Sequence, residues 1–313
     1  MHKEAPAGMS RVAPVRRGRR FGRPRLLIVG CGDIGLRILA RLRDRYRVIA
    51  LTSTPARATE LRAAGALPIV GDLDARRTLA RCVPFAERVI HLAPPPDRGR
   101  SDPRTRHLIA ALAGRAGRLV YVSTTGVYGD ARGAWLDETA PLAPASDRAL
   151  RRVDAERALR REGARGALRV SILRAPGIYD ERGRLPIDRL RQGLPALAPT
   201  DDVYTNHIHA DDLARIAIAA LYRGAPQRVY NAVDDSQLKM GQYFDLVADR
   251  FGLPRPPRLP REELKAAVSP AMYSFMRESR RLRNERVKRE LRVRLRYPTV
   301  ADALAGRGNG ARR

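Results

Sequence analysis

The segment LLIVGCGDIG carries three glycines with the spacing G-x-G-x-x-G: Gly30, Gly32 and Gly35. Between a strand and a helix, such a loop turns tightly, allows a ligand to approach its backbone and presents free helix N–H groups to an anion. The pattern predicts a site for the pyrophosphate of a dinucleotide, with Asp33 and Ile34 among the residues that bind it. A helix N-terminus can also acidify the thiol of Cys31; a small residue that simply fits the loop is the alternative.

The end of the next apolar segment bears on which dinucleotide binds. NAD sites usually place Asp or Glu about 20 residues after the glycines, where the carboxylate binds the ribose 2′-hydroxyl. The stretch IALTSTPAR has hydroxyls and a guanidinium there and no carboxylate. Ser53 and Arg57 suit a 2′-phosphate, so we expect NADP(H) to be preferred over NAD(H). The alternative for Arg57 is a solvated helix residue.

Apolar runs and helical periodicity alternate from residue 25 onward. The apolar runs predict strands at residues 25–30, 47–53, 66–72, 88–93, 118–124 and 168–174. Helical segments are expected between them, at residues 34–45, 56–65, 75–81, 103–117 and 146–159. This alternation predicts an α/β protein, a doubly wound parallel sheet of the Rossmann type with helices on both faces. Ligands of such a sheet bind at the carboxyl ends of its strands.

Composition divides the chain into three parts. Residues 1–24 are rich in Arg, Pro and Gly and predict a disordered basic arm. Residues 25–175 are expected to form the dinucleotide-binding domain. Residues 176–313, where the alternation loosens into proline-rich loops, are expected to form a smaller substrate lobe, with residues 203–232 returning to the sheet.

The net charge of +28 favours a partner that carries phosphate or another anion. The basic residues are scattered and aromatic residues make up only 5%, so nucleic-acid binding through the basic segments is the weaker interpretation. Only two cysteines, Cys31 and Cys82, are present, which predicts a reducing compartment, the cytoplasm. No apolar run is long enough to span a membrane, and no cluster has the spacing of metal ligands.

The stretch YVSTTGVYGD at residues 121–130 resembles the extended short-chain dehydrogenase/reductase superfamily, in its NAD(P)-dependent epimerase/dehydratase family. Other stretches are similar in the same order, namely VGDLD at 70–74, HLAPPP at 91–96, LRAPGIYDERGR at 173–184, NHIHADDLARIAIAAL at 206–221, VYNAVDD at 229–235, and residues 280–304. The resemblance covers about residues 25–304.

This resemblance implies that Asp72, with Leu73 beside it, lies near the adenine and that Ala93 lies near the ribose. Members usually keep a Tyr-x-x-x-Lys pair, in which Tyr exchanges a proton with the substrate and Lys holds the ribose. Here Arg148 and Arg152 stand at those two positions. Arginine keeps its proton near neutral pH, so Arg148 cannot replace the phenol, whereas Arg152 can still bind the cofactor ribose or a phosphate.

The resemblance also implies the substrate side of the site. Thr124 matches the hydroxyl that binds the reacting oxygen, with Ser123 and Thr125 beside it, and Asn284 matches a substrate-side asparagine. Tyr179 is the preferred substitute for the missing acid because its loop borders the nicotinamide; packing is the alternative. Other residues in segments that approach the site, for which packing or capping is the default, are Tyr128, His207 and His209.

Residues 277–296 carry ten Lys and Arg against three Glu. One interpretation is a clamp for an anionic substrate; the other is an exposed helix with pairs such as Glu285 and Arg289.

These patterns predict an NADP(H)-preferring oxidoreductase or epimerase/dehydratase that acts on a small carbonyl or hydroxyl substrate without the usual Tyr acid. A nucleotide sugar is one candidate substrate, and a homodimer is one possible assembly. The alternative is a catalytically silent NAD(P)-binding sensor or scaffold, which the missing Tyr favours and the retained Thr124 disfavours.

Overall fold

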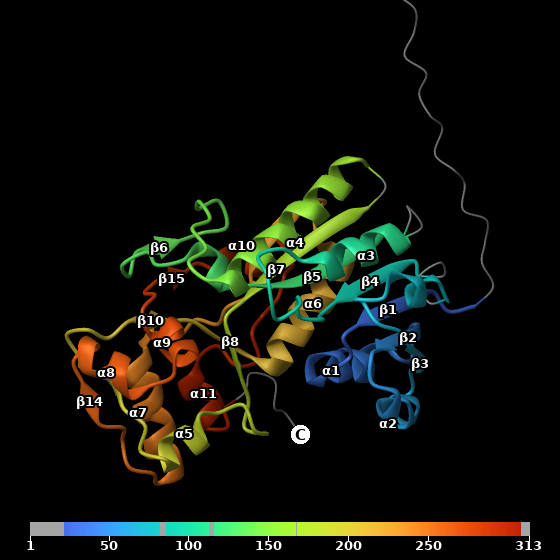
Figure 1. Ribbon diagram of the computed structural model, residues 1–313. Helices are drawn as coiled ribbons and strands as arrows, with labels where there is room; N and C mark the ends of the chain where they lie inside the picture. The colour runs from blue at the N-terminus through green and yellow to red at the C-terminus, as the bar shows by residue number, and fades with distance from the viewer. Residues whose placement is uncertain (1–21, 82–85, 113–115, 167, 308–313) are drawn as a thin grey trace, which may run out of the picture.

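The computed structural model describes residues 22–81, 86–112, 116–166 and 168–307. Most of the expected N-terminal arm, and Cys82, lie outside these ranges. The centre of the molecule is a sheet in the order β12-β7-β5-β4-β1-β2-β3, in which all neighbouring strands are parallel (Figure 1). Its strands are β1 (Arg25–Val29), β2 (Arg47–Thr52), β3 (Leu67–Val70), β4 (Arg88–His91), β5 (Arg118–Thr124), β7 (Arg169–Ala175) and β12 (Arg228–Asn231).

Helices cover both faces of this sheet, which confirms the predicted doubly wound α/β fold. One face packs on α1 (Asp33–Leu42), α2 (Ala58–Ala63) and α6 (Ala210–Arg223), and the other on η2 (Arg76–Arg81), α3 (Pro103–Leu112) and α4 (Asp147–Ala164). The central strands are apolar on both faces because each face is covered. Ser146 caps α4, since its hydroxyl accepts a hydrogen bond from the Ala149 amide at 3.3 Å.

A second group of helices lies away from α2 and α3, beyond the half of the sheet that contains β5 and β7 (Figure 1). It consists of α5 (Ile187–Arg191), α7 (Met240–Phe251), α8 (Arg261–Ala267), α9 (Pro270–Met276) and α11 (Val300–Leu304). These helices share an apolar cluster of their own, separate from the two clusters of the sheet. Short strand pairs join the segments, namely β8 (Gly177–Tyr179) with β11 (His207–His209), β9 (Ala196–Leu197) with β14 (Arg258–Leu259), and β10 (Tyr204–Thr205) with β13 (Leu238–Lys239).

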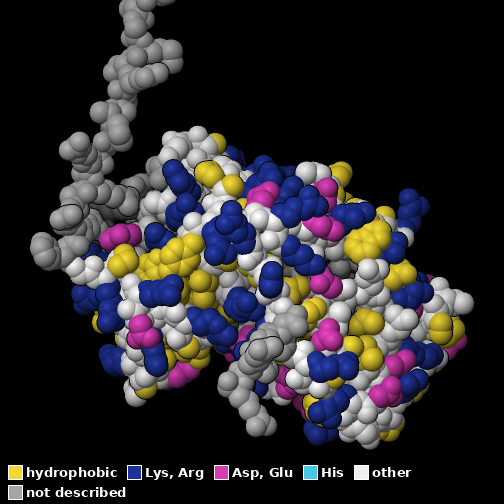
Figure 2. Space-filling view, turned by 180° about the vertical axis from the view of Figure 1, so that it is seen from behind, with side chains coloured by type: hydrophobic (Ala, Val, Ile, Leu, Met, Phe, Trp, Pro, Cys, Tyr) yellow, Lys and Arg dark blue, Asp and Glu magenta, His cyan; other side chains and the backbone are white. Residues whose placement is uncertain are grey.

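The basic segment 277–296 is not one exposed helix, as one of the two interpretations expected. It contains β15 (Arg281–Leu282), which pairs with β6 (Trp135–Leu136), and the short α10 (Glu285–Glu290). The Arg281 guanidinium lies over the rings of Trp135 and Tyr204, at 5.1 and 4.7 Å from their centroids, so packing accounts for this basic side chain. On the face that Figure 2 shows, basic side chains are scattered among acidic and hydrophobic ones.

Within the described ranges, no helix combines the length and apolar character that crossing a bilayer requires. In the same part of the chain, no three His, Cys, Asp or Glu side chains gather as a metal site would require.

Candidate functional site

Two cavities lie at the carboxyl ends of the central strands and meet at Thr124. The first cavity, of about 590 Å³, follows the ends of β1 to β5. The second, of about 610 Å³, lies between the end of β5, the β8 segment and helices α5, α7 and α9. Four residues line both cavities: Thr124, Pro176, Ile178 and Arg184. A ligand in the first cavity can therefore reach a ligand in the second beside the Thr124 hydroxyl.

The glycine loop forms one end of the first cavity and has room for a phosphate. Gly30 has a φ of 78°, and a Cβ there would lie 2.6 Å from the Ala93 amide nitrogen, so only glycine fits. A Cβ on Gly32 would meet nothing within 4 Å, which leaves its surroundings open, whereas one on Gly35 would lie 3.0 Å from the Cys31 sulfur. No side chain caps α1, so its first N–H groups face this end of the cavity. These features fit the pyrophosphate of a dinucleotide.

Two other residues of the loop have partners inside the protein. The Asp33 carboxylate pairs with Arg37 at 3.0 Å and with Arg184 at 3.1 Å, so its charge is neutralised close to the expected phosphate. Cys31 is only 1% exposed, and burial raises the pKa of its thiol to about 11. Burial therefore opposes the acidified thiol that the helix N-terminus suggested, because the thiolate loses its solvation there.

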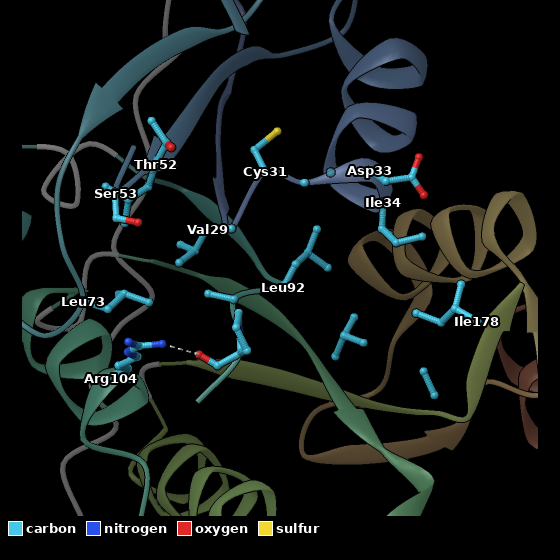
Figure 3. Close-up of a pocket in the computed structure, with 18 of the residues that line it drawn as sticks. Val29, Cys31, Asp33, Ile34, Thr52, Ser53, Leu73, Leu92, Arg104 and Ile178 are labelled. Carbon is cyan, nitrogen blue, oxygen red and sulfur yellow. Dashed lines mark hydrogen bonds between the residues drawn. The ribbon is translucent and has the colours of Figure 1, made fainter. Parts of the chain in front are cut away.

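The end of the first cavity that lies away from Ile178 contains Ser53, Leu73 and Arg104 (Figure 3). Arg57 also lines this end, and its guanidinium already has partners. Nε and Nη2 donate to the two carboxylate oxygens of Glu60 at 3.0 and 3.1 Å, and Nη1 donates to the Cys31 carbonyl at 2.8 Å.

Arg104 is a residue of this end that the sequence patterns did not identify. It pairs with Asp74 at 2.6 and 2.8 Å and donates to the carbonyl groups of Pro94 and Pro95. Arg104 lies in the first turn of α3, and this helix begins near the carboxyl end of β4, where ligands of such a sheet bind. This position is the sequence signal that could have identified it.

All residues predicted to bind the cofactor line the first cavity: Gly30, Gly32, Asp33, Ile34, Gly35, Ser53, Arg57, Asp72, Leu73, Ala93 and Arg152. Arg152 is fixed at one edge, since its Nη1 donates to the Tyr121 hydroxyl at 2.9 Å and to the Val122 carbonyl at 3.0 Å. Its Nε and Nη2 have no acceptor in the part of the chain that the structure describes, which leaves them available to a ligand. The roles of these residues stay predictions.

Thr124 and Ser123 differ in what their hydroxyls can do. The Thr124 oxygen accepts a hydrogen bond from the Gly126 amide at 3.2 Å, and no described residue accepts its hydrogen. This hydroxyl can therefore donate to a substrate oxygen. Ser123 is buried, and its hydroxyl donates to the Glu156 carboxylate at 2.6 Å. Since Glu156 also pairs with the buried Arg174 at 2.7 Å, Ser123 belongs to an internal network despite its predicted contact with substrate.

Arg148, at the position of the usual Tyr, and Tyr179, its preferred substitute, both line the second cavity. Arg148 is exposed, and its guanidinium lies over the Phe275 ring at 4.1 Å from the centroid. The Tyr179 hydroxyl is buried, and burial together with the charge of Asp234 raises the pKa of this phenol well above its ordinary value. Tyr179 contributes its ring to the cavity wall, while its hydroxyl is turned away from the open space.

The structure does not bring Asn284 to either cavity. Its amide donates to the Val233 carbonyl at 2.9 Å and to the Asp235 carboxylate at 2.7 Å, so it holds the segment after β12. Thr125 is buried and lines the second cavity. The other aromatic candidates mainly pack or cap: the Tyr128 hydroxyl donates to Asn231 at 2.7 Å, and His209 accepts from the Asp211 amide at the start of α6. His207, which is buried, lines the second cavity.

Comparisons with known proteins agree with this geometry. A family model described as NAD(P)H-binding matches residues 30–223. A protein of Stigmatella aurantiaca named 4-hydroxy-2-methyl-3-oxo-4-farnesyl-3,4-dihydroquinoline-1-oxide ketoreductase is 26% identical over 241 residues, which are 72% of this chain and 72% of its own.

Solved structures with this fold include a conserved protein of unknown function from Silicibacter pomeroyi. Its TM-score is 0.76 at 31% identity, over 91% of this chain and 98% of its own. UDP-glucose 4-epimerase from Thermotoga maritima, with UDP-glucose, has a TM-score of 0.73 at 19% identity over 90% and 96% of the two chains. dTDP-glucose 4,6-dehydratase from Streptomyces venezuelae, with NAD bound, has a TM-score of 0.72 at 22% identity, over 90% of this chain and 95% of its own.

Proposed function

The chain belongs to the NAD(P)H-binding family, and on this premise we propose that it is an oxidoreductase of the short-chain dehydrogenase/reductase type. It transfers hydride between NADP(H) and the carbonyl or hydroxyl carbon of a small molecule. The observation that carries this proposal is the junction of the two cavities at Thr124, whose hydroxyl hydrogen is free to donate.

The first cavity holds the dinucleotide in this proposal. Gly32 and the N-terminus of α1 bind the pyrophosphate, and Arg152 donates to the ribose through the N–H groups that point away from Tyr121. Preference for the 2′-phosphorylated form rests on Ser53 and Arg57. The acids that line the described part of this cavity are Asp33 and Asp72, and neither belongs to the segment after β2.

The second cavity holds the reacting group beside Thr124. The nicotinamide cofactor, when bound, supplies or accepts the hydride. The Thr124 hydroxyl donates a hydrogen bond to the substrate oxygen and stabilises the negative charge that develops there during reduction. Arg148 keeps its proton and the Tyr179 hydroxyl is buried, so this proposal assigns the proton of the alcohol to water that enters the second cavity.

The similarity to a ketoreductase supports carbonyl reduction as the direction of the reaction. The structures with bound nucleotide sugars or their cofactor are less than 25% identical, so they support the fold and leave the substrate to the chemistry of the second cavity.

The test is to incubate the protein with NADPH and a panel of ketones and to follow loss of the nicotinamide absorbance. Thr124→Ala should lower kcat by about 10² to 10³-fold, the effect of removing one hydrogen-bond donor to a developing oxyanion, with NADPH binding unchanged. Thr59→Ala, at an exposed position of α2, is the matched control and should retain wild-type kcat. Tight NADPH binding without turnover of any ketone would refute the oxidoreductase and support the silent sensor.

A further inference from the structure

The second cavity has an unbalanced positive charge. Among the described residues, its lining includes one acid, Glu278, and four arginines: Arg148, Arg184, Arg189 and Arg280. Two of the arginines have carboxylate partners, since Arg280 pairs with Glu278 at 2.7 Å and Arg184 pairs with Asp33 at 3.1 Å. Arg148 and Arg189 have no carboxylate partner among the described residues.

Arg189 is the more unusual of these two because it is buried. The residue is only 8% exposed, and its guanidinium lies 4.9 Å from the centre of the Phe244 ring, which lines the same cavity. Its Nη2 donates to the carbonyl groups of Leu194 and Pro195, while Nε and Nη1 have no acceptor in the described ranges. A buried guanidinium without a counter-charge destabilises the free protein, and an anionic ligand would remove that cost.

The remaining walls of the cavity are mostly apolar. They include Met240, Phe244, Met272 and Phe275, and the exposed Arg148 lies over the ring of Phe275 near the opening. A hydrophobic chamber with an unpaired guanidinium in its wall favours a ligand with an apolar body and one oxyanion.

We propose that the second cavity binds a carbonyl substrate that carries an oxyanion, a carboxylate or a phosphate, with Arg189 as its anchor and Arg148 as a second cation at the opening. This inference rests on the proposed function for the carbonyl and adds the charge of the substrate. Nε and Nη1 each carry an N–H group without a described acceptor, and a charged N–H group donates strongly to either oxyanion.

The test compares ligands of similar shape and different charge. Binding of 4-acetylbenzoate, 4-acetylphenyl phosphate and the neutral 4-acetylbenzamide is measured by calorimetry, on the cofactor-free protein and on protein saturated with NADP⁺. At least one anion should bind about tenfold or more tightly than the amide, and the tighter of the two identifies the oxyanion. Equal binding of all three, or no detectable binding of either anion, would overturn the proposal.

Substitutions then locate the site. Arg189→Gln removes the charge but keeps an amide donor for the Leu194 and Pro195 carbonyls, and it should abolish the preference for the anion. Arg191→Met, two residues later on α5 and 65% exposed at its side chain, is the matched control and should keep that preference. Arg148→Met should reduce the preference for the anion, and it serves as the test if Arg189→Gln fails to fold. An anion preference that survives both substitutions would also refute the assignment.

This binding assay is independent of turnover. A protein that prefers the anions but never oxidises NADPH would retain the anion site and refute the oxidoreductase. A protein that reduces neutral ketones and shows no anion preference would support the oxidoreductase and refute the anion site.

Discussion

Replacing Arg57 by alanine is expected to lower the affinity for NADPH much more than the affinity for NADH. In the structure the Arg57 guanidinium spans the glycine loop and the first turn of α2, where it donates to the Cys31 carbonyl and to both oxygens of Glu60. A 2′-phosphate bound beside Ser53 would meet this guanidinium and compete with Glu60 for its N–H groups. The Arg57 side chain is 32% exposed and that of Glu60 is 49% exposed, so exchanging one partner for the other disturbs no packing.

The magnitude follows from the bonds that change. A hydrogen bond to a charged group contributes about 1.5–3 kcal/mol, or about 10 to 100-fold in affinity. Loss of the Cys31 contact loosens the glycine loop for both dinucleotides, so the informative quantity is the ratio of the two Kd values. We expect Arg57→Ala to lower the NADPH preference by about 10 to 100-fold.

Glu60→Gln is the matched opposite change. It removes the carboxylate that competes with the phosphate and leaves Arg57 in place, so NADPH affinity should rise a few-fold while NADH affinity stays constant. In the Arg57→Ala background the same substitution should have no effect on the ratio, because the two residues act through one contact.

The assay is titration of each protein with NADPH and with NADH by calorimetry at fixed ionic strength, since a phosphate contact weakens with salt. Parallel loss of affinity for both dinucleotides in Arg57→Ala would refute the reasoning and leave Arg57 as a support of the loop. Tighter binding of NADH than NADPH by the wild-type protein would refute the cofactor preference itself.

Three further substitutions test the site and its support. Gly30→Ala should abolish dinucleotide binding in calorimetry while the fold persists in circular dichroism, because the new Cβ would lie 2.6 Å from the Ala93 nitrogen at a φ of 78°. Arg174→Met should lower the free energy of unfolding by about 3–5 kcal/mol in urea, since it leaves the buried Glu156 charge without its partner; an unchanged midpoint would contradict this. Burial lowers the pKa of His207 from 6.5 to about 3. Between these two values the unfolded chain binds a proton that the folded chain does not bind, so the free energy of unfolding decreases as the pH is lowered. The wild type should lose about 1.4 kcal/mol per pH unit more than His207→Gln in that window; parallel pH profiles would contradict the assignment.

Much of the fold and of the cofactor cradle was predictable from local sequence. Strand ends, helix starts and the glycine spacing depend on a few neighbouring residues, and these patterns placed six strands of the sheet and the loop after β1 correctly. Residues 203–232 were expected to return to the sheet, but β12 within them was not identified as a strand. It is only four residues long, and it follows the segment in which the regular alternation is lost.

Local sequence did not predict which polar side chains remain free to bind a ligand. The Ser123 hydroxyl donates its hydrogen to Glu156, which lies 33 residues later, and the Arg57 guanidinium donates to Glu60 beside the expected phosphate. Asn284 follows the family pattern in sequence, yet it bonds to the segment after β12 and lines neither cavity. Each outcome depends on a partner that the sequence pattern did not assign to that residue.

The sequence by itself determined that a parallel sheet ends in a phosphate-binding loop, because periodicity and glycine conformation act over a few residues along the chain. The tertiary structure alone decided which hydroxyl, guanidinium and thiol remain free to act. Thr124 keeps its hydrogen, Cys31 is buried, and Arg189 is enclosed without a counter-charge, since burial and pairing arise when segments distant in sequence pack against one another.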